Sequence, residues 1–258
     1  MKQLAEAVQL AERMADAARP VVMRSFRTPA LAVEAKADDS PVTVADREAE
    51  AVLRGMIEET FPKHGIVGEE HGIIRGEADY VWVLDPIDGT KSFVTGKPLF
   101  GTLIALLREG RPVIGVIDMP ALGERWVGAE GQATTFNGRP VRCRTCTALS
   151  DAWLYATSPA MFRMDDLQAF QRLGARCRAT VYGADCYAYG LIANGTVDLV
   201  CEASMQPYDY CALVPVVAGA GGVITDWNGA PLALSSDGRV LAAGDPSAHA
   251  AAREALAH

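Results

Sequence analysis

The sequence lacks several features that would indicate particular classes of protein. No apolar run approaches the roughly 20 residues that a membrane-spanning helix needs, and charged residues interrupt the first apolar pattern, so neither a membrane protein nor a secretory signal is expected. Clusters of basic residues are also absent, and the net charge is −8 at pH 7. Because a negatively charged protein repels nucleic acid and anionic lipid, no nucleic-acid or membrane partner is expected. An anionic substrate would therefore need a local source of positive charge.

The six cysteines are spread along the chain, and only Cys143 and Cys146 form a close pair. A single Cys-x-x-Cys pair, without a second pair or a nearby histidine, is a weak zinc signal, so reduced thiols are favoured over a zinc site. Free thiols are typical of a reducing compartment. The expected location is the cytoplasm.

The pattern of apolar residues changes near the middle of the chain. Up to residue 148 it predicts helices and then a run of strands, whereas from residue 149 short strands alternate with helices. With 258 residues, 50% of them hydrophobic, the chain can form one compact unit. The expected fold class is α/β, with an α+β half at 1–148 and an α/β half at 149–258. The main expected helices are 3–25, 46–59, 165–173, 184–194, 210–220 and 242–257, and the main expected strands are 66–72, 80–84, 100–107, 113–119, 124–128, 133–136, 178–181, 197–201 and 222–225.

The most informative stretch begins with an apolar strand at residues 80–84 and ends on Asp85. Pro86 fixes its own φ and keeps the residue before it extended, so the carbonyl of Ile87 and the carboxylate of Asp88 return within one tight turn. Three hard oxygens can then converge on one point. Such donors, without histidine or cysteine, suit Mg²⁺ that is shared with a substrate phosphate.

Gly89 and Thr90 come directly after this turn. A glycine that a phosphate can approach closely, followed by exposed backbone N–H groups, predicts an anion-binding site. The alternative is structural, because an Asp-Gly pair between apolar runs is also a strong hairpin signal. The residues alone leave both interpretations open.

Further acids stand at the ends of other predicted elements. Glu69 and Glu70 close a second strand, with Glu69 16 residues before Asp85. Asp46 stands at the start of one helix and Asp209 directly before another. An aspartate at a helix start is most often a cap, so for Asp46 and Asp209 capping remains the alternative to a place in a metal cluster.

Taken together, these motifs resemble the Mg²⁺-dependent, lithium-sensitive inositol monophosphatase family, in the family's order and over nearly the whole chain. The matching stretches are Val42-Thr43-x-Ala45-Asp46, Gly68-Glu69-Glu70, Trp82-x-x-Asp85-Pro86-Ile87-Asp88-Gly89-Thr90, and Tyr208-Asp209 followed by Gly219-Ala220-Gly221-Gly222. The resemblance implies a five-layered αβαβα sandwich, with most metal ligands and the phosphate loop in the first half. It also implies a homodimer.

The resemblance assigns roles to the matched positions. It implies two or three Mg²⁺ ions per site, held by Glu69, Asp85, the carbonyl of Ile87, Asp88 and Asp209. It implies that Asp46 and Thr90 polarise the attacking water together with Glu69. The phosphate would be held by the backbone N–H groups of Gly89 and Thr90, with Asp88 and Asp209 also contacting the substrate.

Two stretches of the second half look like the histidinol-phosphate phosphatase branch of the family. They contain Asp185, at residues 182–189, and Glu202, at residues 201–209. An acid beside a phosphate site suits a substrate with a cationic end, and histidinol phosphate carries an ammonium and an imidazole, whereas inositol carries hydroxyls. Glu202 would bind the alcohol of either substrate. For Asp185, helix capping is the alternative.

The leading prediction is therefore hydrolysis of L-histidinol phosphate to L-histidinol, a step of histidine synthesis, by in-line attack of water without a phosphoenzyme. The alternatives are inositol-1-phosphate hydrolysis, hydrolysis of other sugar or nucleotide monoesters, and, outside enzymes, a metal-binding scaffold of the same fold. Two details are also expected in the second half. Pro215 should remove a backbone hydrogen bond from the helix at 210–220 and kink it, and His249 and His258 should face solvent on the terminal helix.

Overall fold

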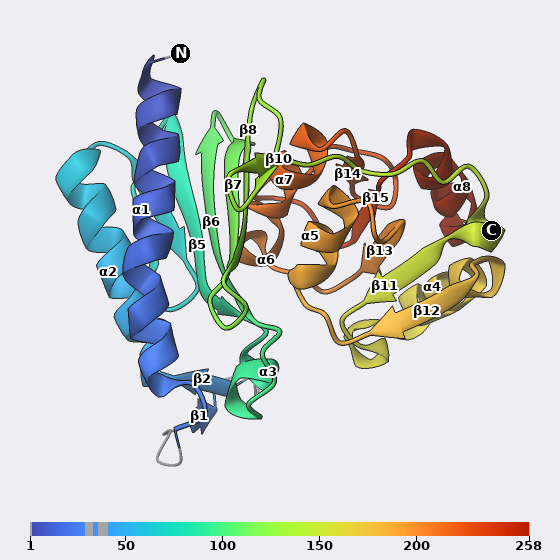
Figure 1. Cartoon of the computed structure of the whole chain (residues 1–258), viewed down its shortest axis with the longest axis horizontal. Helices are drawn as coiled ribbons and strands as arrows, with labels where there is room; N and C mark the ends of the chain where they lie inside the picture. Colours follow the sequence, from blue (N-terminus) through green and yellow to red (C-terminus); the bar gives the residue numbers. More distant parts are fainter. Residues whose placement is uncertain (1, 29–32, 36–40, 258) are drawn as a thin grey trace.

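The computed structural model of the chain describes residues 2–28, 33–35 and 41–257. Within them, helices and sheets stack in five layers, in the order α, β, α, β, α (Figure 1). The predicted αβαβα sandwich is confirmed. The helices are α1 (Lys2–Ser25), α2 (Val44–Thr60), α3 (Thr90–Val94), α4 (Met164–Arg176), α5 (Tyr187–Ala193), α6 (Pro207–Tyr210), α7 (Leu213–Gly219) and α8 (Pro246–Ala257), with short 3₁₀ turns at Leu149–Asp151 and Pro159–Met161.

The larger sheet has eight strands among the described residues, in the order β10-β9-β8-β7-β6-β5-β3-β4. All neighbours in it are antiparallel except β3 and β5, which are parallel. Its strands are β3 (Gly65–Gly68), β4 (Gly72–Ile74), β5 (Tyr80–Asp88), β6 (Gly101–Arg108), β7 (Arg111–Met119), β8 (Glu124–Ala129), β9 (Thr135–Phe136) and β10 (Arg139–Pro140). A separate antiparallel pair, β1 (Val33–Ala35) and β2 (Pro41–Thr43), precedes α2.

The smaller sheet lies wholly in the second half of the chain and has the order β12-β11-β13-β15-β14. Strand β11 is parallel to β12 and β13, whereas β15 is antiparallel to β13 and β14. Its strands are β11 (Trp153–Ala156), β12 (Ala179–Tyr182), β13 (Leu199–Glu202), β14 (Val223–Thr225) and β15 (Val240–Ala243). Helices α4 and α8 cover its outer face (Figure 1).

Helices α5, α6 and α7 form the middle layer, where α7 approaches the larger sheet unusually closely. A Cβ atom on Gly115 of β7 would lie 1.9 Å from the carbonyl oxygen of Ala212, and one on Gly128 of β8 would lie 2.4 Å from that of Pro215. Two glycines at neighbouring positions in the β7–β8 ladder thus let the helix backbone rest on the sheet. This contact determines how close to the larger sheet the segment that carries Asp209 lies.

The expected helix at 210–220 is divided into α6 and α7, which the sequence did not predict. Its helical hydrogen bonding ends at Tyr210 in α6 and resumes at Leu213 in α7. Pro215 has no N–H to donate to the carbonyl of Cys211, four residues earlier, so one bond of a continuous helix cannot form there. The dihedral angles of Cys211 and Ala212 stay helical, which keeps α6 and α7 on one path.

The prediction for the C-terminus was wrong in two respects. Residues 240–243 form the buried strand β15, and the helix begins only at Pro246. His249, expected in solvent, is buried and lies with its Nε2 2.9 Å from Thr225 Oγ1. Burial, more than the nearby charge of Arg253, lowers its pKa to about 4, so it is neutral at pH 7. His258 lies outside the described residues.

None of the helices that the structure describes combines the length and the apolar character of a membrane span.

The contact between α7 and the sheet gives a test of stability. We expect Gly115→Ala to lower the free energy of unfolding by about 1–3 kcal/mol, because the added methyl group forces the helix backbone outward. Gly55→Ala is the matched control: this exposed position in α2 has no atom within 4 Å of an added Cβ, and the change should raise stability by about 0.5–1 kcal/mol. Urea denaturation of both variants measures the two shifts, and equal effects would contradict the close-contact argument.

Candidate metal centre

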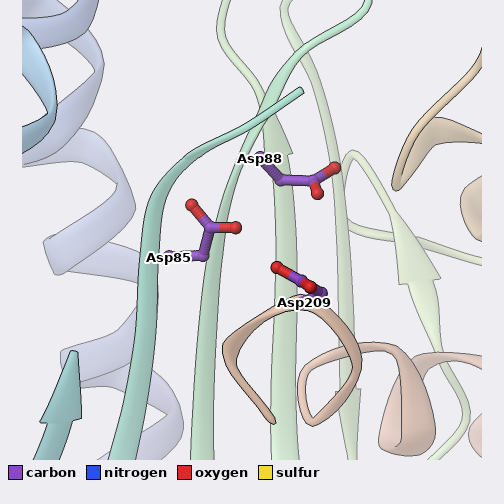
Figure 2. Close-up of side chains that lie close together, drawn as sticks. All are labelled: Asp85, Asp88 and Asp209. Atoms are coloured by element: carbon purple, nitrogen blue, oxygen red, sulfur yellow. The ribbon is translucent and has the colours of Figure 1, made fainter. Parts of the chain in front are cut away.

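Asp85, Asp88 and Asp209 come together where the middle layer meets the larger sheet. One carboxylate oxygen from each lies within 4.8 Å of one from each of the other two. Figure 2 shows Asp85 and Asp88 on the same strand with their carboxylates directed toward that of Asp209, which comes from the facing helix. Two acids of one sequence motif and a third from a distant motif are thus brought together.

A local irregularity in β5 lets its two aspartates face the same side. Residues three apart on a regular strand point to opposite faces of the sheet. Here the pairing of β5 with β6 shifts in register between Asp85 and Asp88, and such a bulge redirects side chains. The bulge is held by hydrogen bonds from the Ile87 N–H to Asp85 Oδ1 (3.0 Å) and from Thr102 Oγ1 to the Pro86 carbonyl (2.8 Å).

The hairpin interpretation of Asp88-Gly89 is wrong. Strand β5 leads into α3, and β6 begins only at Gly101. Gly89 adopts a left-handed φ of +81°, and a Cβ there would lie 3.1 Å from both the Asp185 carboxyl carbon and the Leu99 carbonyl oxygen. Thr90 Oγ1 donates to the Ile87 carbonyl at 3.1 Å, which places this hydroxyl beside a predicted metal-binding oxygen.

Asp46 and Asp209 are both the acid of a capping box, a pattern in which a carboxylate three residues into a helix accepts from the N-cap backbone. Asp46 Oδ2 accepts from the Thr43 N–H (2.9 Å) and from Thr43 Oγ1 (2.7 Å). Asp209 Oδ2 accepts from the Gln206 N–H at 2.6 Å. Capping and proximity to the cluster therefore hold together for Asp209, which caps α6 and faces Asp85 and Asp88.

The N-cap residues of these two boxes, Thr43 and Gln206, were not predicted from the sequence. For Asp46 the signal was present, because Thr43 precedes it by three residues, the spacing of a capping box. For Asp209 the cap is a glutamine, which is not among the residues preferred at that position.

Burial and mutual repulsion act on the acids of this centre. Burial, followed by the charges of Glu69, Asp88 and Asp209, raises the pKa of Asp85 well above its usual range. Burial, followed by Asp185 and Asp209, does the same for the pKa of Asp88. A cation bound among the carboxylates would favour their ionised form and offset both effects. Hard oxygen donors of this kind fit Mg²⁺ or another hard divalent ion.

Glu69 and Asp46 lie at the edge of the cluster. Glu69 is outside the group of three whose oxygens all approach within 4.8 Å, yet its charge contributes to the raised pKa of Asp85. Its backbone N–H donates to the Leu84 carbonyl at 3.3 Å, so it follows β3 alongside β5. Burial chiefly raises the pKa of Asp46 to about 6, and the charges of Glu70 and Glu69 add to the effect.

A cavity of about 170 Å³ adjoins these acids and is lined by Asp88, Asp209, Asp185 and Glu202. Glu202 is buried at the end of β13, where it accepts from the Thr157 N–H (2.7 Å) and from Tyr189 OH (2.9 Å). A larger cavity of about 580 Å³ lies between the β7–β8 region and α7. It has Glu130 as its one acid, so the smaller cavity is the better match to the predicted chemistry.

Asp185 reaches the phosphate loop from the second half of the chain. Its Oδ2 accepts from Ser92 Oγ in α3 at 3.1 Å, and the N–H of the next residue, Cys186, donates to Asp88 Oδ2 at 2.8 Å. The capping interpretation of Asp185 is wrong, since α5 begins at Tyr187 without a side-chain cap. Nothing in the sequence indicated that the backbone of Cys186 would orient Asp88.

Comparisons with known proteins agree with this geometry. The model of the inositol monophosphatase family matches residues 3–258. The chain is 49% identical over 252 residues to the bifunctional phosphatase IMPL2, chloroplastic, of Arabidopsis thaliana. This alignment covers 94% of this chain and 72% of that protein. It is 35% identical over 243 residues to a histidinol-phosphatase of Chlorobaculum parvum, with 91% of each covered.

A solved structure of an inositol monophosphatase from Zymomonas mobilis superimposes with a TM-score of 0.91 at 45% identity, over 98% of each chain. The sequence motifs, the layered fold, the acidic cluster and these matches lead to one conclusion: the chain belongs to the inositol monophosphatase family.

Proposed function

We propose that this chain is a Mg²⁺-dependent phosphatase that hydrolyses L-histidinol phosphate to L-histidinol and phosphate. The observation that carries the proposal is the cavity in which Asp185 and Glu202 lie beside Asp88 and Asp209. Cation ligands and acids suited to a cationic leaving group thus line one small space. The homodimer and the cytoplasmic location remain predictions.

Asp85, Asp88, Asp209, Glu69 and the carbonyl of Ile87 are the groups that would hold the metal. Bound Mg²⁺ would neutralise phosphate oxygens, lower the pKa of a water and stabilise the departing alkoxide. A carboxyl group that carries a proton is a poorer ligand, because metal binding requires the deprotonated form. The metal affinity of this centre should therefore fall as the pH is lowered.

The chain's own residues would then orient water and phosphate. Thr90 Oγ1, which donates to the Ile87 carbonyl, and Asp46, which accepts two hydrogen bonds from Thr43, would polarise the attacking water. The backbone N–H groups of Gly89 and Thr90, at the start of α3, would contact the phosphate. No nucleophilic side chain is needed for in-line attack by water.

Asp185 decides the substrate in this proposal, because Glu202 would bind the alcohol of either substrate. Burial raises the pKa of Asp185, while the hydrogen bond from Ser92 and the charges of Lys97 and Lys91 act in the opposite direction. An ammonium group of the substrate would compensate Asp185 further and would gain a charge-assisted hydrogen bond. Inositol-1-phosphate and other sugar or nucleotide monoesters offer hydroxyls to the same position, and they remain the alternatives. The non-enzyme alternative, a metal-binding scaffold, does not need the phosphate loop.

Asp88→Asn tests the metal centre. The change removes one negative charge and little volume, and we expect Mg²⁺-dependent phosphate release to fall by about 100-fold or more, because even neighbours of metal ligands typically contribute 10–100-fold. Thermal unfolding should show a folded protein. Asp151→Asn, at an exposed position outside the cluster, should keep full activity. Asp88→Asn with normal activity at ordinary Mg²⁺ would refute the metal assignment.

Asp185→Asn tests the substrate. Removal of the charge should lower kcat/KM for histidinol phosphate by at least about tenfold more than kcat/KM for inositol-1-phosphate, since a tenfold effect corresponds to about 1.4 kcal/mol of lost interaction. The unmodified protein should prefer histidinol phosphate in a panel of phosphate monoesters. Equal losses on both substrates would make Asp185 a structural residue, and a preference for inositol-1-phosphate would select the first alternative.

A further inference from the structure

Glu50 is a completely buried carboxylate in α2, one helical turn after Asp46. Its Oε2 accepts from the backbone N–H of Glu70 at 2.7 Å, and its Oε1 accepts from that of His71 at 3.1 Å. Arg54 Nε donates to the same Oε1 at 2.6 Å. The hydrogen bonds to this buried charge thus come from Arg54 and from the turn between β3 and β4.

The same turn is attached to α2 at further points. Arg54 Nη2 donates to the Gly72 carbonyl, and His71 Nε2 lies 3.1 Å from the Arg47 carbonyl. On the other side of Glu69, a Cβ on Gly68 would lie 2.0 Å from Glu50 Oε1. The Glu50 carboxylate thus lies directly against the backbone that precedes Glu69 and binds the backbone that follows it.

A buried charge is costly unless it is paired and hydrogen-bonded, so its partners indicate what it fixes. Asp198 shows the same chemistry elsewhere: it is buried, paired with Arg144, and accepts from the Trp153 N–H at 2.8 Å. Asp198 stands before the start of β13, whereas the cavity residue Glu202 stands at its end. Asp198 connects the start of β13 to the start of β11, away from the metal centre. Glu50 instead holds the turn between β3 and β4, whose first residue, Glu69, is a predicted metal ligand.

We propose that Glu50 is a positioning residue: it fixes the backbone on both sides of Glu69 and so aims that carboxylate at the metal centre. Asp46 and Glu50 stand four residues apart on α2. This one helix would therefore position Asp46 directly and Glu69 through Glu50. This inference rests on the proposed function, because it presumes that Glu69 binds the metal. Groups that orient metal ligands typically change metal affinity or activity by 10–100-fold when they are altered.

Two variants test the contact in different ways. Glu50→Gln keeps the shape but replaces one acceptor oxygen by an N–H donor, which cannot accept from the turn. Gly68→Ala keeps the carboxylate and displaces it by the added methyl group. Asp198→Asn is the matched control, since it weakens an equally buried Arg-paired carboxylate away from the acids. For each protein, the Mg²⁺ concentration for half-maximal phosphate release and the Mg²⁺-induced rise in Tm are measured.

We expect Glu50→Gln and Gly68→Ala to need about 10–100-fold more Mg²⁺ for half-maximal activity and to show a smaller rise in Tm at a fixed Mg²⁺ concentration. Asp198→Asn should match the unmodified protein in both responses, whatever its Tm without metal. If Glu50→Gln does not fold, Gly68→Ala decides alone. A Mg²⁺ requirement no larger than that of Asp198→Asn would overturn the role of Glu50 and leave the metal centre standing. An unmodified protein whose activity and Tm ignore Mg²⁺ would overturn both.

Discussion

Mutual repulsion among buried carboxylates is the constraint on which this structure depends. Asp85, Asp88 and Asp209 have oxygens within 4.8 Å of one another, and burial and neighbouring charges raise the pKa of both strand aspartates. Such a cluster is unfavourable by itself, so the surrounding fold must hold it in place. A hard divalent cation would reverse the sign of the interaction, so carboxylates that repel one another would together attract such an ion.

The fold holds the cluster with ordinary devices of secondary structure. A bulge in β5 turns two aspartates to one side, a capping box anchors Asp209 at the start of α6, and Gly115 and Gly128 let the following helix lie directly on the sheet. The capping box stabilises α6 while it places Asp209, so capping does not compete with a place in the cluster for this aspartate. The bulge instead disrupts the ladder of β5 locally, and the hydrogen bonds of Asp85 and Thr102 hold it.

Much of this could be predicted from the sequence, because the strong signals were local. The strand at residues 80–84, the long helices and the order of the motifs indicated the fold. The errors arose where distant contacts override local pattern. Ala242 and Ala243 were assigned to the alanine-rich terminal helix, yet they lie in β15, which pairs with both β13 and β14. His249 is polar, yet Thr225 provides a partner that allows its burial.

In the candidate site, too, local features could be predicted from the sequence, whereas contacts between distant residues could not. Its acids could be found because each stands at the end of a predicted element, but their relative placement depends on contacts between residues far apart in the chain. Glu50 is the clearest example: in sequence it is one charged residue on a helix with several, and only its hydrogen bonds to Glu70 and His71 connect it to the cluster. The burial of Glu50 and its hydrogen bonds could therefore not be inferred from the helical pattern, in which it looks like a solvent-exposed charge.

In the proposed function, Asp185 would link phosphate binding to recognition of the leaving group. It packs against Gly89 and bonds to Ser92 from the opposite half, so a negative charge stands beside the loop proposed to hold a dianion. Repulsion would weaken phosphate binding unless positive charge lies nearby, and Lys97 and Lys91 supply part of it. A substrate with its own ammonium group supplies the rest only when it is bound. An uncharged polyol cannot. Under the proposed function, the same carboxylate would therefore favour histidinol phosphate and disfavour inositol phosphate, and specificity would arise from the balance of charge around one side chain.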